Sequence, residues 1–242
     1  MSSIASQYGN LINLAGISIP SSGDNKAQYA IEIIKSKEFL KHLLTFDSVK
    51  INLVAVNGYN KIDNSLKYDK KIYDIDKNTW IKSPSFKNQQ EPSYLEVYED
   101  FFINNLRVNH DKNSNFINIS FEHPSPDFAY ELLNLIYYEI NNLTRVKDIE
   151  TSNRSIDYLK DRLSETQQKE ITQSINSLIS SQLKIQMLAT TRDDYILSII
   201  DKPYIPEKES SPIRWMYSLI GLFLGLILSS LYFLTRHYLY KK

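Results

Sequence analysis

The stretch SPDFAYELLNLIYYEINNLTRVKDIETSNRSIDYLKDRLSE, residues 125–165, decides the fold. Ser125 is suited to cap a helix, Pro126 fits the first helical position, and the charge of Asp127 complements the helix dipole. This start predicts a long amphipathic helix, because apolar residues then recur at helical spacing. They are Phe128, Leu132, Leu135, Ile136, Ile140, Leu143, Val146, Ile149, Ile156, Leu159 and Leu163.

No Gly or Pro interrupts the 76 residues from Asp127 to Lys202. A single helix of that length would reach about 110 Å, so the sequence predicts one reversal near Ser164–Lys169. The apolar stripe of such a helix needs a partner helix, and another copy of the chain would supply one. A long helical hairpin within one chain is the alternative.

The residues before this helix predict a mixture of helices and strands. Residues 1–26 are rich in Ser, Gly and Asn and predict a flexible loop that ends in a turn. Residues 27–44 predict an amphipathic helix. Its apolar face would hold Ile31, Ile34, Phe39 and Leu43.

Further along, residues 57–92 show weak periodicity and predict an irregular excursion. A short helix is expected over 93–105, because Ser93 and Glu96 have the spacing of a capping box. Residues 106–123 alternate between apolar and polar side chains around the turn sequence DKNSN, which predicts a β-hairpin.

After the long helix, DYILSIID (194–201) predicts a β-strand that returns along the domain. The Pro-rich stretch KPYIPEKESSPIR follows it. Pro203, Pro206 and Pro212 are incompatible with a helix interior and predict a stiff extended spacer.

An uncharged run of 21 residues, WMYSLIGLFLGLILSSLYFLT (215–235), comes next. At helical rise it matches the roughly 30 Å hydrocarbon core of a bilayer, so we expect a transmembrane helix. Within it, Gly221 and Gly225 form G-x-x-x-G, a spacing that lets two membrane helices approach closely. Arg236, Lys241 and Lys242 place the short tail in the cytoplasm by the positive-inside rule.

The composition excludes several classes of function. The chain has 242 residues, 28 basic and 28 acidic side chains, and no Cys. Zero net charge argues against a nucleic-acid partner, and the lack of Cys removes disulfides and thiolate metal sites. The sequence has neither a P-loop nor a G-x-G-x-x-G string, so we expect no nucleotide cofactor.

The sequence also offers no enzyme motif. The histidines are His42, His110, His123 and His237, and their spacing matches no metal site. Neighbouring acids such as Asp193 and Asp194 are common at the ends of helices and strands. We therefore expect no catalytic, cofactor-binding or metal-binding residues. The residues alone leave two interpretations, an oligomeric helical scaffold on a membrane and a single-pass envelope adaptor or tether.

Five stretches resemble the bacterial chain-length determinants, the Wzz-type polysaccharide co-polymerases. The most specific are MLATTRDDYILSIIDKPYIPE and the Pro-rich collar that leads into the C-terminal apolar run. The others are SSIASQYGNLINLAGISIP, AIEIIKSKEFL and NFINISFEHPSPDFAYELLNLIYYEINN. Pro203, Pro206 and Pro212 match the family's Pro-rich motif, and Gly221 and Gly225 lie where its membrane helix often contains Gly.

The resemblance implies an α+β protein with a membrane-proximal α/β base, a long extended helix and a C-terminal transmembrane helix. It implies a homo-oligomer without enzymatic activity that regulates lipopolysaccharide O-antigen length by acting on the polymerase in the inner membrane and on the nascent polysaccharide. Family members have a further membrane helix before the periplasmic domain. We therefore expect the true start of this chain to lie upstream.

The expected organisation has six parts, with the bulk of the chain periplasmic and the protein in the bacterial inner membrane. They are a flexible loop (1–26), a periplasmic α/β base (27–124), a long helical section (125–192), a returning strand with the Pro-rich collar (193–214), a transmembrane helix (215–235) and a cytoplasmic tail (236–242).

Overall fold

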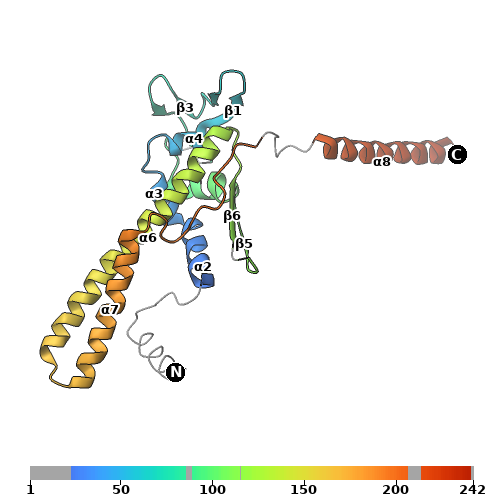
Figure 1. The fold of residues 1–242 in the computed structure, drawn as a ribbon. Helices are drawn as coiled ribbons and strands as arrows, with labels where there is room; N and C mark the ends of the chain where they lie inside the picture. Colours follow the sequence, from blue (N-terminus) through green and yellow to red (C-terminus); the bar gives the residue numbers. More distant parts are fainter. Residues whose placement is uncertain (1–22, 86–88, 115, 207–213, 241–242) are drawn as a thin grey trace. The chain divides into compact units, whose positions relative to one another are not determined.

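The computed structural model describes residues 23–85, 89–114, 116–206 and 214–240 (Figure 1). The chain divides into two compact units, Met1–Tyr204 and Ile205–Lys242. The first unit combines helices with antiparallel strands and is therefore an α+β structure. Within the described residues the strands form three separate two-stranded sheets.

Three helices open the described part of the first unit: α2 (Gly23–Ile34), α3 (Lys37–Leu43) and α4 (Val49–Ala55). The single helix predicted over 27–44 is therefore two helices. The break has a local cause, because the Ser36 side chain caps α3 by accepting a hydrogen bond from the backbone N–H of Phe39 at 3.1 Å. All four residues of the predicted apolar face are buried. Residues 23–26 of the predicted loop lie in α2, and residues 1–22 are outside the described residues.

Two short hairpins occupy much of the stretch predicted to be irregular. In the first, β1 (Val56–Asn60) pairs with β2 (Ser65–Tyr68). In the second, β3 (Tyr73–Asp74) pairs with β4 (Thr79–Trp80). Both turns are closed by Asn and Asp side chains that bond to the backbone, and such local turn chemistry leaves little periodicity in the sequence.

The helix predicted over 93–105 is divided. One turn, α5 (Tyr94–Glu96), continues into a π-helix, η1 (Val97–Phe102). The β-hairpin predicted over 106–123 is confirmed: β5 (Leu106–Asp111) pairs with β6 (Phe116–Phe121) in a register that sets Leu106 opposite Phe121.

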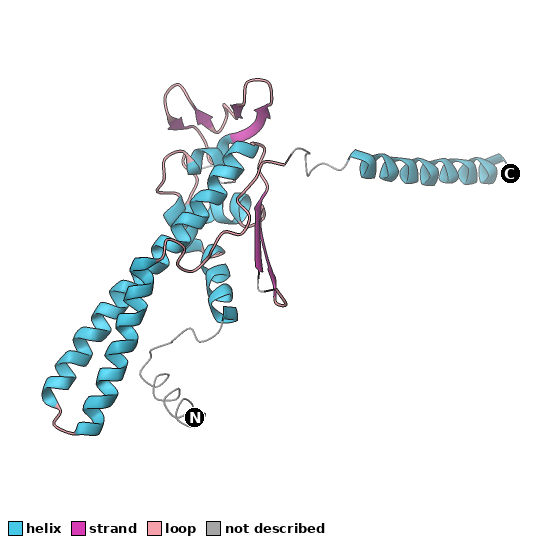
Figure 2. Ribbon diagram, in the orientation of Figure 1, coloured by secondary structure: helices cyan, strands magenta, loops and turns pink. Residues whose placement is uncertain are grey.

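The long helix and its reversal are also confirmed. Helix α6 runs over Pro126–Glu165 and α7 over Lys169–Thr191, and the two helices pack antiparallel as a hairpin (Figure 2). The Ser125 side chain accepts a hydrogen bond from the N–H of Phe128 at 3.2 Å, as the N-cap prediction requires. The apolar stripe of α6 therefore packs against α7 of the same chain, which corresponds to the helical hairpin given above as the alternative to a second copy.

The hydrophobic core lies in the part of the first unit from α2 to Ile140 of α6, which we call the base. Its largest fully buried side chains include Phe102, Leu40 and Ile136. The rest of α6 and α7, residues 141–191, form what we call the stalk. Val146 belongs to the predicted apolar stripe but is 55% exposed, so the stripe does not continue evenly from base to stalk.

The strand predicted over 194–201 is wrong. Within the described residues 192–206 the chain forms bends and loop without any strand. The cause is a long-range contact, since the backbone N–H groups of Tyr195, Ile196 and Leu197 all bond to the side chain of Asn141 instead of to a neighbouring strand.

The second unit contains α8 (Arg214–Tyr240). The predicted C-terminal transmembrane helix is contradicted, because no helix in the described part of the chain is both long and apolar enough to cross a bilayer. A span needs about 20 consecutive apolar residues.

Candidate functional site

A dense set of polar contacts lies where the chain leaves α7 and passes back along α6. We call residues 192–198 the return loop. Asn141 of α6 is 3% exposed, and its Oδ1 accepts the N–H groups of three successive loop residues at 2.8–3.0 Å. Its Nδ2 donates to the carbonyl oxygens of Leu197 at 3.1 Å and Tyr137 at 3.0 Å. One amide therefore fixes the backbone of the return loop.

Two tyrosine–aspartate pairs tie the same loop to α6. Tyr137 of α6 donates its hydroxyl to Asp194 of the loop, and Tyr195 of the loop donates to Asp148 of α6 at 2.6 Å. Burial, followed by the hydrogen bond to Asp194, raises the pKa of Tyr137 to about 12. Burial and the bond to Asp148 likewise raise the pKa of Tyr195. Both phenols are therefore neutral donors at physiological pH.

Arg145 binds the carbonyl end of α7. Its guanidinium donates from Nη2 to the backbone oxygens of Arg192 at 2.9 Å and Asp193 at 2.5 Å. A cation at this position satisfies carbonyl groups that the helix leaves unpaired and complements the negative end of its dipole. The Nε of Arg145 and the Oγ1 of Thr144 are buried without a hydrogen-bond partner.

The side chains that hold the return loop recur along one face of α6. They are Tyr137, Asn141, Arg145 and Asp148, so they fall three or four residues apart, the spacing that aligns residues on a helix. Each of them is engaged with the loop. The arrangement acts as a structural anchor, because it fixes the root of the stalk to the base.

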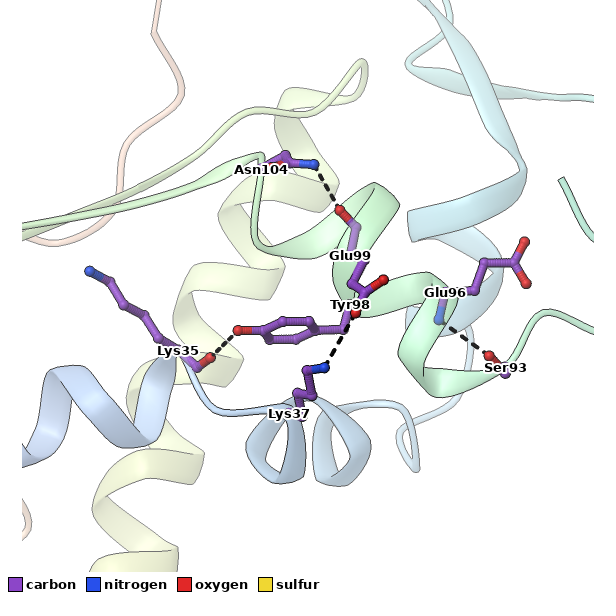
Figure 3. A network of polar contacts seen from close by, with 7 residues as sticks. All are labelled: Lys35, Lys37, Ser93, Glu96, Tyr98, Glu99 and Asn104. Carbon is purple, nitrogen blue, oxygen red and sulfur yellow. Dashed lines mark hydrogen bonds and ion pairs between the residues drawn. The ribbon is translucent and has the colours of Figure 1, made fainter. Parts of the chain in front are cut away.

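A second polar network joins η1 to the α2–α3 corner (Figure 3). The Tyr98 hydroxyl donates to the backbone oxygen of Lys35 at 2.7 Å, and the Nζ of Lys37 lies 3.3 Å from Glu99 and 5.4 Å from the centre of the Tyr98 ring. Asn104 donates from Nδ2 to the backbone oxygen of Glu99 at 2.7 Å. Glu99 lies in the last turn of η1, where helix carbonyls lack partners within the helix, and Asn104 supplies a side-chain donor to one of them.

The predicted capping box is half formed. Ser93 accepts the N–H of Glu96 at 3.2 Å, as expected (Figure 3). The Glu96 carboxylate, however, is 3% exposed and accepts the Ser83 hydroxyl at 2.6 and 2.8 Å and the Ser85 N–H at 2.9 Å. It therefore fixes the segment after β4 instead of the start of its own helix.

The structure places the other residues singled out from the sequence as follows. Pro203 is half-buried in the first unit, and Pro206 is exposed in the second. Pro212, Lys241 and Lys242 lie outside the described residues. Gly221 and Gly225 lie one turn apart on α8, and a Cβ added at either would meet nothing within 4 Å.

His42 and His123 contribute to the packing of the first unit. His42 pairs with Glu139 at 2.7 Å, and His123 bonds to the backbone oxygen of Asn52 at 3.0 Å. Asp194 holds the return loop, as described above. Among the residues that the structure describes, no group of three His, Asp or Glu side chains could hold a metal ion.

Sequence reasoning missed Asn141 and its neighbours on α6. The available signal was the apolar stripe itself, in which Asn141, Thr144 and Ser152 occupy buried positions expected to be apolar. A polar side chain on the buried face of a helix requires a hydrogen-bond partner. No protein-family model and no curated protein sequence matches the chain.

Proposed function

We propose that this chain is a non-enzymatic regulator of surface polysaccharide chain length, for lipopolysaccharide O-antigen or a related polymer. In this role it acts as a homo-oligomeric scaffold for the polymerase. The observation that carries the proposal is the stalk, a helical hairpin that continues α6 beyond the base and is fixed there by Asn141. The sequence resemblance of the return loop and the Pro-rich stretch to chain-length determinants supports the same function.

The surface of the stalk supports assembly with other copies. Its buried seam is thin, and apolar side chains remain exposed on both helices: Val146 at 55%, Leu183 at 51% and Met187 at 57%. Exposed apolar side chains gain free energy when a partner covers them. Regulation by a scaffold depends on how copies are arranged and needs no catalytic group, so a stalk with exposed apolar side chains supports the proposal.

The test is the surface polysaccharide of a strain that lacks the gene, separated on a gel. We expect deletion to remove the modal length band and complementation to restore it. Complementation with Leu183→Asp together with Met187→Asp should broaden the band, because both changes place charge on the exposed apolar surface of the stalk. Both side chains are half exposed, so folding should be retained.

The matched control is Asn176→Asp together with Ser177→Asp, which adds the same charge at exposed polar positions of α7. This control should restore a normal band. Light scattering of the purified variants reports whether the loss of the band follows loss of the oligomer. An unchanged ladder in the deletion strain would contradict the proposal and favour an adaptor or tethering role.

A further inference from the structure

The two short hairpins of the base each expose an isoleucine at the turn. Ile62, between β1 and β2, is 96% exposed, and Ile75, between β3 and β4, is 54% exposed. Turns normally carry Gly, Pro, Asn, Asp or Ser, because these residues satisfy the turn backbone. A branched aliphatic side chain in water contributes little to folding there, and it gains free energy when a partner covers it.

The turns that present these isoleucines are held by their own side chains. Asn60 Oδ1 accepts the N–H of Ile62 at 3.2 Å, and Asp74 Oδ1 accepts the N–H of Asp76 at 3.1 Å. Each turn then places an Asn with φ of 52° just before the second strand, Asn64 in one hairpin and Asn78 in the other. The two isoleucines are therefore displayed in similar, preformed turns.

The two hairpins also share one root and project at the same end of the base (Figure 1). Asp69 connects them, since its N–H bonds to the oxygen of Ala55 at 2.7 Å and its own oxygen accepts the N–H of Tyr73 at 3.0 Å. The first hairpin is anchored to the start of α6, where Tyr59 donates to Asp127 at 2.5 Å. The hairpins thus lie at one end of α6, and the tip of the stalk lies about 60 Å away at the other.

The surface around the turns is basic. Between residues 57 and 85 the chain has six Lys and four Asp, a net charge of +2. The acids take part in the turns: Asp63 accepts the Ser65 hydroxyl at 2.7 Å, and Asp74 lies 3.5 Å from the Nζ of Lys77. The lysines are all exposed, namely Lys61, Lys67, Lys70, Lys71, Lys77 and Lys82.

We infer that the two hairpins dock on an anionic lipid surface, with Ile62 and Ile75 entering the region between headgroups and acyl chains and the lysines facing the headgroup charges. Interfacial binding of this kind needs buried apolar area together with attraction to anionic lipids. The hairpins supply both features in one place. A soluble polyanion would use the lysines but would leave the isoleucines in water. The inference is independent of chain-length control, because it concerns the base and needs no polysaccharide.

The experiment uses the full chain, whose lack of Cys allows single labels. Ile62→Cys and Ile75→Cys, each carrying an environment-sensitive fluorophore, are mixed with vesicles of phosphatidylcholine and phosphatidylglycerol, or of phosphatidylcholine alone. The control is Ile200→Cys, another isoleucine, 68% exposed in the loop before the Pro-rich stretch. Because the label reports its own surroundings, attachment of the chain to vesicles elsewhere gives no signal.

At positions 62 and 75 we expect a blue shift and quenching by brominated lipids, only with the anionic vesicles and weakened by salt. Position 200 should show neither effect. Labels at 62 and 75 that stay in water would overturn the inference, whether or not the chain sediments with vesicles. Equal shifts with neutral vesicles would contradict the role of the lysines. The same shift with soluble polyphosphate would mean that the hairpins bind a polyanion and not a lipid surface.

A pair of charge-reversal substitutions tests whether the lysines act in lipid binding and not through the stability of the fold. Lys70→Glu together with Lys71→Glu should raise the concentration of anionic lipid needed for the shift at least tenfold. Lys160→Glu together with Lys184→Glu, two exposed lysines of the stalk, should leave it unchanged. Circular dichroism of both pairs should match the parent chain. Equal losses in the two pairs would show that net charge alone drives binding, which would overturn the assignment to the hairpins.

Discussion

The base and the stalk are held together by different means, although α6 runs through both. The base buries large apolar side chains from several elements, including Leu43, Phe102 and Phe121 around α6. The stalk buries a single seam between α6 and α7, in which Ile156, Leu159 and Ile175 alternate with polar or small residues. These are Thr144, Ser152, Gln182 and Ala189.

This difference implies unequal local stability within one unit. Burial of apolar area is the main favourable contribution to folding, so the base should unfold only globally. The stalk has fewer such contacts per residue and depends on the polar joint at Asn141. An element of this kind can rearrange without disturbing the core, which is what the scaffold role proposed above would require.

The largest expected effect is in the base. Phe102 is fully buried and contacts the rings of Tyr98 and Phe121, with centroids 6.4 and 6.0 Å away. Phe102→Ala should lower the free energy of unfolding by about 3–5 kcal/mol, because it removes the ring and leaves a cavity. Urea denaturation measures this change. Phe116→Ala, at a residue 55% exposed, is the control and should change little. A small loss of unfolding free energy in Phe102→Ala would contradict the view that the base is more stable than the stalk.

The next largest effect on stability is expected at Asn141, which holds the return loop against α6. Asn141→Ala leaves three partly buried N–H groups of the return loop without their acceptor and should cost about 2–3 kcal/mol. Amide hydrogen exchange should increase first at residues 195–197. The exposed neighbour Asn142→Ala is the matched control. If exchange at the return loop did not change, Asn141 would not be the residue that fixes it.

How far the sequence predicted this architecture depends on the range of the contacts involved. The N-cap at Ser125, the reversal after Glu165 and the hairpin at 106–121 follow from local spacing, and all three are confirmed. The strand at 194–201 was wrong because its alternation is local, whereas the acceptor of its N–H groups lies on α6 more than fifty residues earlier.

The candidate site was harder to predict than the fold. Pro203 and Gly221 were chosen from local sequence pattern and then from resemblance, and the structure gives neither of them a polar network. Asn141 carried no motif, and its one signal was a polar residue next to the apolar stripe of the helix; the backbone groups that it binds lie more than fifty residues away and left no mark in the sequence. The split at Ser36 could have been found, because a Ser followed by Lys-Glu inside a predicted helix is also an N-cap signal.

A smaller effect is expected in the seam of the stalk. Ile175→Ala should cost about 2 kcal/mol, at the low end for a buried isoleucine, because exposed residues flank it and the hairpin can close around the gap. Hydrogen exchange should become faster in α6 and α7 beyond Asn141, while the amides of α3 and β6 keep their protection. Asn176→Ala is the exposed control. Equal acceleration in base and stalk would mean that the two regions unfold together.

The smallest effect concerns His123, which joins β6, α4 and the start of α6. Its Nε2 donates to the Asn52 oxygen at 3.0 Å, its Nδ1 accepts the N–H of Ser125 at 3.1 Å, and the Phe128 ring lies 4.6 Å away. Burial lowers the pKa of His123 below its ordinary value of 6.5. The unfolded chain therefore binds this proton more readily than the folded chain.

The stability that His123 contributes should accordingly be complete above about pH 6.5 and should decline as the pH falls through its lowered pKa. One proton limits the slope to about 1.4 kcal/mol per pH unit. The measurement is urea denaturation of the parent chain and His123→Gln between neutral and mildly acidic pH, with His110→Gln as control. The difference between parent and His123→Gln should shrink on acidification. A constant difference would mean that the folded chain tolerates a charged ring at His123, and would contradict the prediction.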